Sequence, residues 1–310
     1  MENKFKYSFN GKRYHTYNYY LKQKYNCKVA KVILDAGFTC PNRDGKKSFG
    51  GCIYCSGKGS GDSNVALSED ILIQYKKNKE VMDNKWPNDL YIPYFQSFTN
   101  TYGPLSKIKE MIEPFLNMDE VCEIALATRC DCLEDEVIEY LGSLNKPITL
   151  ELGLQSSNDI TGKLINRGHS FQEFKQALYK LENTNIKVCV HIMNGLPFES
   201  KDDMLQTVKD INHLPFDAIK IHMLHILKDT TMARMYESKP FELISREEYI
   251  ELVVKQLELL KPEIVVERLT GDPMKDDLIY PEWVLNKTTI LNDIDKLMRK
   301  LDTYQGSKYE

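Results

Sequence analysis

The chain has 310 residues, 42% of them hydrophobic, which is enough for one large domain or a barrel with an appendage. Its net charge is −4. No run of eighteen apolar residues and no signal-peptide core follow from Met1 onward, so we expect no membrane insertion and no secretion, and a soluble cytoplasmic protein. Eight cysteines in such a protein are better explained as thiols or metal ligands than as disulfides.

Residues 1–30 form a basic segment rich in tyrosine. Eight Lys or Arg residues lie between Met1 and Lys31, with six tyrosines and the single acid Glu2. Cations neutralise phosphates and aromatic rings stack on unpaired bases, so the segment is suited to hold RNA. The alternative is a solvated basic arm whose tyrosines pack on the body of the protein.

The middle of the chain alternates short apolar runs with amphipathic ones, as repeated βα units do. Strands are predicted at 31–37, 90–95, 123–128, 148–154, 187–194 and 217–224, and helices at 68–83, 104–116, 133–143, 170–184 and 201–212. Pro104 and Ser170 stand where a helix start favours proline or a capping hydroxyl. Parallel strands joined by helices imply a barrel or an open sheet, with the active site at the carboxyl ends of the strands.

The last part of the chain is predicted to contain a helix at 245–260, a strand-like stretch at 263–269, a polar loop and a helix from about 286 to 301. We expect this part to cap the core. The predicted division is therefore a segment 1–30, a core 31–240 and an extension 241–310.

Three cysteines follow the first predicted strand, with the spacing C-x11-C-x2-C: Cys40, Cys52 and Cys55. Four ligands normally fill a [4Fe-4S] cluster, so three thiolates leave one iron open. The competing interpretation is zinc, because C-x2-C is a common half of a tetrahedral zinc site. Neither Cys27, Cys122 nor His15 supplies the second half, so the spacing favours the cluster over zinc and over coincidence.

Polar residues follow the other strands. Residues 96–101 follow the second strand, Arg129 and Asp131 the third, and Gln155 closes the fourth. Glu151 lies on a predicted buried strand, so its charge needs an ion-pair partner or a polar barrel interior facing the active site. Arg129 and Asp131 are candidates for substrate contact, or simply pair with each other.

These residues resemble the radical S-adenosylmethionine (SAM) superfamily, in which the usual spacing is C-x3-C-x2-C. The longer first gap resembles the Elp3-like branch, and GFTCPNRDGKKSFGGCIYCS resembles the YhcC/YtqA-like proteins of bacteria. The motifs YFQSFTNTY, ATRCDCL, ELGLQSSND, NRGHS, HIMNGLPFES and ERLTGDP extend the resemblance from about Gly11 to Trp283. It implies an α/β fold, a partial (β/α)6 TIM-like barrel with a C-terminal α/β extension.

The resemblance also implies the cofactors. A [4Fe-4S] cluster would be bound by Cys40, Cys52 and Cys55, its open iron chelated by SAM, and an electron from a donor such as flavodoxin or ferredoxin would cleave SAM to a 5′-deoxyadenosyl radical. The residues implied to contact SAM are Gln96, Ser97 and Thr99 at the methionine amino group, Gln155 and Arg167, and His191 and Asn194 at the ribose or adenine. The Gly-Gly-Glu type motif that family members carry after the second strand is absent here.

Two further histidines, His222 and His225, have a spacing that places them on opposite faces of a regular strand, so we expect at most one of them to contact a ligand. Arg268, Asp272 and Trp283 are expected to have structural roles.

The Elp3-like resemblance and the basic segment together indicate tRNA as partner. The family suggests the conversion of carboxymethylaminomethyluridine towards aminomethyluridine at the wobble position, U34. One alternative is a radical SAM enzyme for a small metabolite or tetrapyrrole, with a closed apolar pocket. The other is a zinc-stabilised, non-catalytic RNA-binding protein.

Overall fold

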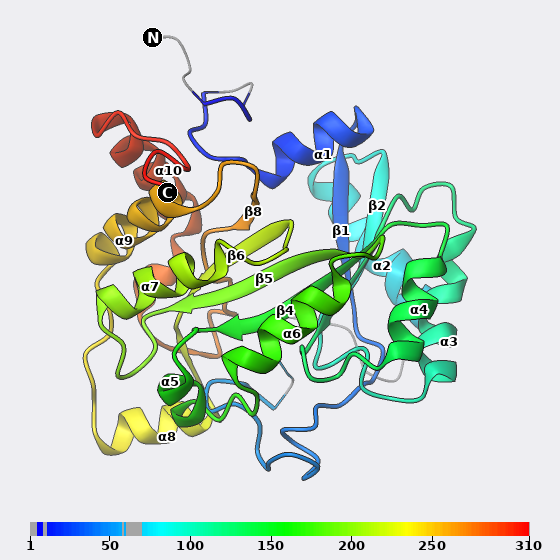
Figure 1. Cartoon of the computed structure of the whole chain (residues 1–310), viewed down its shortest axis with the longest axis horizontal. Coiled ribbons are helices and arrows are strands. Elements are labelled where there is room, and N and C mark those ends of the chain that lie inside the picture. Colours follow the sequence, from blue (N-terminus) through cyan, green and yellow to red (C-terminus); the bar gives the residue numbers. More distant parts are fainter. Residues whose placement is uncertain (1–4, 9–10, 58, 60–69, 310) are drawn as a thin grey trace.

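The computed structural model describes residues 5–8, 11–57, 59 and 70–309. Seven parallel strands form its main sheet, in the order β1-β2-β3-β4-β5-β6-β8. The sheet curls into a partial barrel (Figure 1). The strands are β1 (Val29–Leu34), β2 (Leu90–Phe95), β3 (Ile124–Thr128), β4 (Ile148–Gln155), β5 (Lys187–Asn194), β6 (Ala218–Met223) and β8 (Val265–Arg268). The predicted fold class is confirmed, and all six predicted strands are present.

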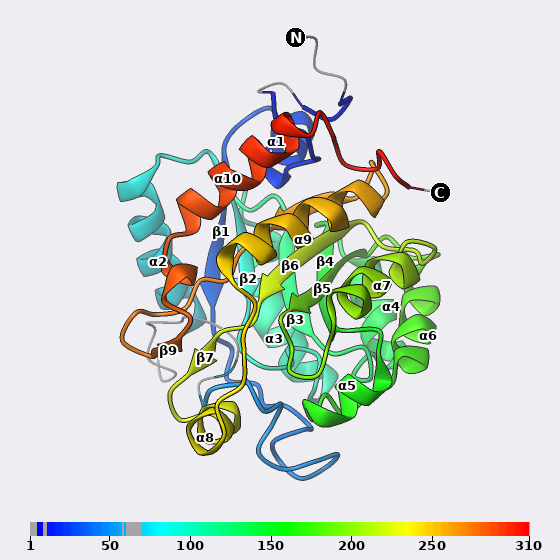
Figure 2. The same ribbon diagram turned by 90° about the vertical axis from the view of Figure 1, so that its left-hand side faces the viewer.

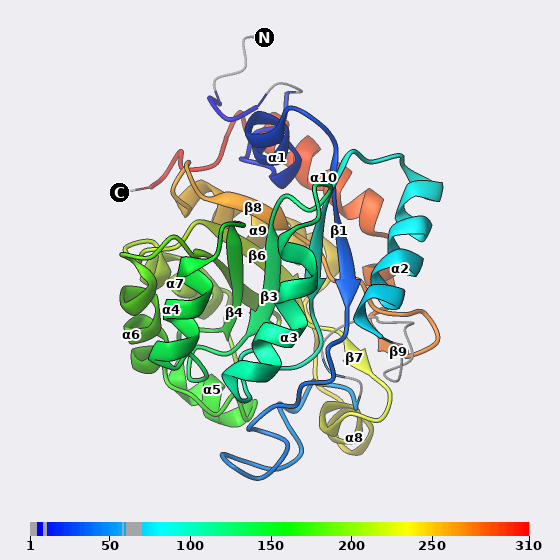
Figure 3. The same ribbon diagram turned by 90° about the vertical axis from the view of Figure 1, so that its right-hand side faces the viewer.

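Helices between the strands cover the outer face of the sheet (Figure 3). They are α2 (Ile71–Lys85), α3 (Leu105–Leu116), α4 (Asp135–Ser143), α5 (Asp159–Leu164), α6 (Phe171–Leu181) and α7 (Lys201–Ile211). Outward strand residues such as Leu152 and Val190 pack with Phe174 of α6 in the main core. Pro104 precedes α3 as predicted, and Ser170 caps α6 in a capping box with Glu173. Residues 68 and 69 of the helix predicted at 68–83 lie outside the described residues.

A helix that the sequence did not predict, α1 (Tyr17–Tyr25), covers the amino-terminal end of the barrel. Thr16 caps its start and Asn26, in the left-handed region at φ 54°, ends it. Tyr17 and Tyr20 pack with residues of the barrel interior, and Leu21 is buried. In the described part of residues 1–30, the tyrosines thus pack on the body of the protein, as the alternative prediction had it.

Strand β8, within the stretch predicted as strand-like at 263–269, joins the sheet beside β6. Lys31 of β1 reaches Glu267 of β8 across the interior at 2.6 Å, which brings the two edge strands of the curled sheet together. Helix α1 lies beside both edges, and a β-bridge joins Thr16 to Val266. The open edges of the sheet are therefore covered, which prevents pairing with other chains.

The other elements of the last third of the chain are seen best in Figure 2. They are β7 (Ile226–Leu227), α8 (Thr231–Ser238), α9 (Arg246–Leu259), β9 (Leu278–Tyr280), the 3-10 helix η1 (Glu282–Leu285) and α10 (Lys287–Lys300). β7 and β9 pair antiparallel in a second, two-stranded sheet. The division at residues 30 and 240 stays a prediction, although β8 shows that residues after 240 contribute to the main sheet. None of the described helices has the length and apolar composition needed to span a bilayer.

Candidate functional site

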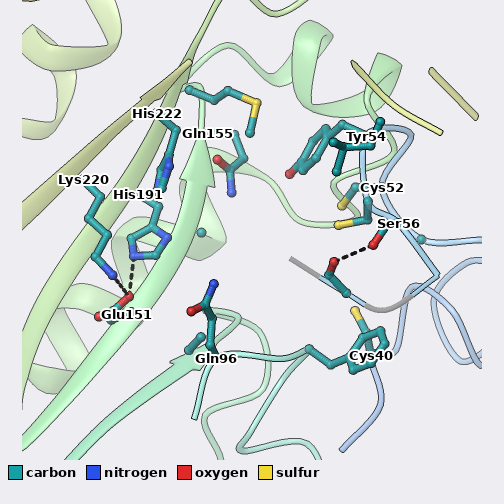
Figure 4. Close-up of a pocket in the computed structure, with 18 of the residues that line it drawn as sticks. Cys40, Cys52, Tyr54, Ser56, Gln96, Glu151, Gln155, His191, Lys220 and His222 are labelled. Carbon is teal, nitrogen blue, oxygen red and sulfur yellow. Dashed lines mark hydrogen bonds and ion pairs between the residues drawn. The ribbon is translucent and has the colours of Figure 1, made fainter. Parts of the chain in front are cut away.

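A cavity of about 310 Å³ lies at the carboxyl ends of the parallel strands. Figure 4 shows its two sides: Cys40, Cys52 and Tyr54 face Glu151 and His191 across the opening. The predicted site residues that line it are Cys40, Cys52, Cys55, Gln96, Thr99, Arg129, Glu151, Gln155, Arg167 and His191. Ser97, Asp131 and Asn194 are not part of the wall that the described residues form.

The three cysteines lie on the loop between β1 and α2, and each is a half-buried free thiol. The amide of Arg43 donates to the carbonyl oxygen of Cys40 at 2.8 Å, and that of Cys55 to Cys52 at 3.0 Å, so both cysteine positions lie in tight turns. The loop thereby presents three sulfur atoms to one cavity.

The surroundings of Cys52 favour its thiolate. A hydrogen bond with the Cys55 thiol outweighs the effect of burial, and together with the charge of Arg129 it lowers the pKa of Cys52 to about 6. Tyr54 and Asn42 add hydrogen bonds that act in the same direction. Iron and other metals bind the thiolate form, so these contacts prepare the loop for a metal centre.

The NRGHS segment anchors the cysteine loop. The buried amide of Asn42 donates to the carbonyl oxygens of Asn166 at 2.6 Å and Arg167 at 2.9 Å, and Asn166 in return donates to the carbonyl oxygen of Gly51 at 2.8 Å. Gly168 has φ +80°, and a Cβ placed there would lie 2.2 Å from Oδ1 of Asn42. Only glycine fits this close approach.

Replacing Gly168 by alanine is therefore expected to displace the cysteine loop. The clash and the strained φ together should destabilise the loop by about 1–3 kcal/mol and lower the iron bound after anaerobic reconstitution. Iron and sulfide analysis measures this. Gly142→Ala is the matched control, since a Cβ there meets no atom within 4 Å. Equal iron contents in the two variants would contradict the anchoring role.

Gln155 lines the cavity, and its side-chain oxygen has no hydrogen-bond donor among the described residues. Its backbone has φ +68°, and its side-chain Oε1 is buried without a hydrogen-bond partner in the described structure. Gln96 and Thr99 line the same wall, while the Oγ of buried Ser97 has no partner among the described residues. A buried acceptor without a partner costs free energy, which a donor on a bound ligand would recover.

Arg167 is 2% exposed, and its guanidinium is hydrogen-bonded to other residues of the protein. It donates to the carbonyl oxygens of His169 at 2.8 Å, Leu154 at 3.0 Å and Ser156, and it pairs with Asp159 at 2.7 Å. These contacts fasten the end of β4 to the segment after it. Contact with SAM stays a prediction, and a ligand carboxylate would compete with these internal acceptors.

Glu151 lies at the centre of a charged cluster inside the barrel. Its carboxylate pairs with Lys31 at 2.7 Å and with Lys220, and accepts hydrogen bonds from Tyr94 at 2.5 Å and His191 at 2.8 Å. Burial alone would raise the pKa of Glu151, but Lys220 and Lys31 hold it well below its usual range. The ion pair and the place on the cavity wall, which the sequence analysis gave as alternatives, are thus present together.

Arg129 and Asp131 pair with each other, one of the two arrangements predicted. Two nitrogen–oxygen contacts of 2.9 Å join them, and Lys47 lies 2.5 Å from the same carboxylate. Burial opposes the ionised form, but the hydrogen bonds and charge of Arg129 lower the pKa of Asp131 to about 2. The ion pair with Asp131 holds the guanidinium of Arg129 on the cavity wall that also carries the cysteines, and Asp131 itself does not line the cavity.

The histidines and Asn194 lie in two different environments. Asn194 is 1% exposed and exchanges two hydrogen bonds of 2.8 Å with Gln256, so it belongs to the core between β5 and α9. His222 and His225 both line the cavity, and contact of at most one of them with a ligand stays a prediction. The regular strand ends at Met223, so strand alternation does not extend to His225.

Sequence reasoning missed Lys220, Tyr94 and Arg268 on the cavity wall. Lys220 and His222 alternate on β6, and this spacing of polar residues on one face of a buried strand was the available signal. Arg268 was expected to be structural, but it lines the cavity. So does Asp272, which had been given the same role.

Within the described residues, no group of three or more His, Cys, Asp or Glu side chains is arranged around a single metal ion. Three thiols nevertheless line one cavity wall, with an unpaired buried acceptor nearby, and this donor set fits a cluster that is open on one side and a ligand bound to it.

The comparisons with known proteins agree with this geometry. Residues 40–211 match the model of the radical SAM superfamily, and residues 216–300 match that of the radical SAM C-terminal domain. The chain is 44% identical over 310 residues to the uncharacterized protein YtqA of Bacillus subtilis, covering 99% of this chain and 96% of that protein. The structure of Elp3 from Methanocaldococcus infernus, lacking its first 46 residues, superposes with a TM-score of 0.67 at 18% identity, over 90% of this chain and 64% of that chain. A tRNA uridine(34) acetyltransferase of M. infernus is 26% identical over 153 residues, 48% of this chain and 28% of that protein.

The partial barrel and the cysteine loop at its carboxyl end define a protein of the radical SAM class. The chain belongs to the radical SAM superfamily, and within it to the family of YtqA and YhcC. The resemblance found in the sequence is thereby confirmed.

Proposed function

We propose that this radical SAM protein modifies the wobble uridine of tRNA, converting carboxymethylaminomethyluridine towards aminomethyluridine. The observation that carries the proposal is the two-sided cavity, with three thiols on one wall and a polar, cationic wall opposite (Figure 4). A substrate side chain that bears a charge can thus face the cofactor. The similarity to a tRNA uridine(34) acetyltransferase supports tRNA as the substrate class.

The chain's own residues fit the cofactors. Cys40, Cys52 and Cys55 would hold a [4Fe-4S] cluster, and Gln155, Gln96 and Thr99 lie where they can contact SAM. When bound and reduced by a low-potential donor, the cluster would supply the electron for reductive cleavage of SAM. The proposed reaction would oxidise the carboxymethyl CH2 group by two electrons, one leaving with the hydrogen atom taken by the deoxyadenosyl radical and the other passing to an oxidised acceptor. Water would then hydrolyse the resulting C=N bond, which leaves the amine of aminomethyluridine and releases glyoxylate.

Exposed residues of the cysteine loop suit a single-stranded RNA loop. Phe49 is 79% exposed, and exposed Lys46 lies three positions before it, while Lys47 is paired with Asp131. A basic surface with an exposed aromatic ring can bind phosphates and stack on an unpaired base. The basic segment 1–30 is less suited to this, because α1 lies at the opposite end of the barrel.

The alternative of a small metabolite or tetrapyrrole predicted a closed apolar pocket. The wall that contains Glu151, His191, Lys220 and Arg268 does not fit that prediction. The radical SAM superfamily model covers the cysteine loop, which supports an enzyme rather than the zinc-stabilised, non-catalytic module.

The test uses the reconstituted protein with SAM, a reductant and tRNA from cells that accumulate carboxymethylaminomethyluridine. Nucleoside mass spectrometry is expected to show aminomethyluridine, with 5′-deoxyadenosine formed alongside it. Omitting SAM is the control. Formation of 5′-deoxyadenosine without any change in the nucleosides would agree with the radical SAM assignment and contradict tRNA as the substrate.

A further inference from the structure

One arginine of the cavity wall differs from its neighbours. Arg43, Arg129 and Arg167 also line the cavity, and each donates hydrogen bonds to a protein acceptor. The guanidinium of Arg268 has no hydrogen bond or ion pair with any described residue, although the residue is half-buried. A guanidinium removed from water without a partner is costly, so its position on a cavity wall indicates a ligand.

A β-bulge directs Arg268 to this wall. Val266 pairs with Ile219 and Arg268 with Lys220, so Glu267 is the extra residue on β8. Glu267 fills the barrel interior, and the next side chain, Arg268, reaches the cavity. Bulges commonly re-aim a side chain beside an active site.

The charges around Arg268 leave it as the surplus cation. Inside the barrel, Glu151 and Glu267 are both in ion pairs with Lys31 and Lys220, which balances two acids against two lysines. Arg268 adds a third positive charge, and its field helps to keep the pKa of buried His222 well below the usual range, after burial and the effect of His191.

Two carboxylates of the loop after β8 also line the cavity, those of Asp272 and Asp277. Asp272 is directed elsewhere, since it is 55% exposed and pairs with Lys287 at 2.8 Å. Neither aspartate forms an ion pair with Arg268 in the structure described. The guanidinium thus keeps its donors for a bound anion.

We propose that Arg268 is the carboxylate receptor of the substrate site. The inference rests on the proposed function, in which the substrate side chain ends in a carboxylate. A guanidinium binds a carboxylate through two parallel N–H···O bonds, which fixes its orientation as well as its charge. Arg268 then holds the carboxymethyl group on the wall formed by β6 and β8.

The first test compares two anticodon stem-loops in the presence of SAM, one with carboxymethylaminomethyluridine and one with aminomethyluridine. The wild type is expected to bind the first more tightly. Arg268→Gln should lose about tenfold or more of that preference, and binding of the second stem-loop should stay unchanged. Arg268→Lys keeps the positive charge but not the two parallel donors, so its preference for the first stem-loop should lie between those of the wild type and Arg268→Gln. Arg299→Gln, at an exposed position of α10, should show the same preference as the wild type.

Two outcomes overturn the proposal. Equal weakening of both stem-loops by Arg268→Gln would indicate a structural role. Weaker binding of SAM itself, with the stem-loop preference intact, would assign the guanidinium to the SAM carboxylate instead.

A second measurement does not depend on tRNA. Phenylglyoxal modification of Arg268, followed by peptide mass spectrometry, should be slowed by acetate or glycine and not by chloride at equal ionic strength. Protection by carboxylates without any stem-loop preference in the wild type would overturn the tRNA function and retain Arg268 as a carboxylate receptor. No protection would overturn the receptor itself.

Discussion

Replacing Cys52 by alanine is expected to abolish both cluster binding and the formation of 5′-deoxyadenosine. The cavity wall offers three thiols, and a cluster that already relies on three protein ligands would keep only two. Cys52 is also the thiol whose pKa is lowered to about 6, so the variant removes the sulfur that most readily binds as thiolate. Bound iron should fall from about four atoms per chain to near zero after anaerobic reconstitution.

The matched control is Cys27→Ala, because Cys27 follows α1 at the opposite end of the barrel. It should retain iron, the visible absorbance of the cluster and 5′-deoxyadenosine formation. Product from Cys52→Ala at the wild-type rate would refute the ligand assignment. Loss of product in both variants, with circular dichroism unchanged, would show that the assay reports general thiol chemistry instead.

Glu151→Gln is expected to lower the free energy of unfolding by about 3–5 kcal/mol, the range for breaking a buried ion pair from one side. The carboxylate has four partners, and its removal leaves Lys31 and Lys220 to share the charge of Glu267. Urea denaturation measures the change. Glu247→Gln, at an exposed pair with Arg246, should change stability by no more than about 1 kcal/mol.

A double variant separates the charge effect from a packing defect. Adding Lys220→Met to Glu151→Gln removes the lysine whose ion pair with Glu151 is broken. The double variant should therefore lose less free energy of unfolding than the sum of the losses in the two single variants. Additive losses would mean that the two charges do not interact in the folded protein. The same variants should lose product formation, since both side chains line the cavity.

Local sequence patterns were sufficient for the strands and for most helices. Apolar runs of four to eight residues bounded by turns predicted β1 to β6, and the Ser170 hydroxyl marked the start of α6, where the structure adds a reciprocal cap with Glu173. Helix α1 was missed because its tyrosines and lysines have no apolar periodicity of their own. Its burial depends on the barrel interior, with which Tyr17 and Tyr20 pack.

The cysteine spacing by itself favoured a cluster over zinc, because ligand type and number are properties of the residues and not of their placement. Only the tertiary structure decided which polar residues meet. Lys31 and Glu267 are 236 positions apart and come together because the sheet curls, and the bulge that directs Arg268 to the cavity is a feature of strand pairing. The hydrogen bonds of Asn42 to Asn166 and Arg167, next to Gly168, also depend on the curling of the sheet. They join residues more than a hundred positions apart, and no local sequence pattern specifies such contacts.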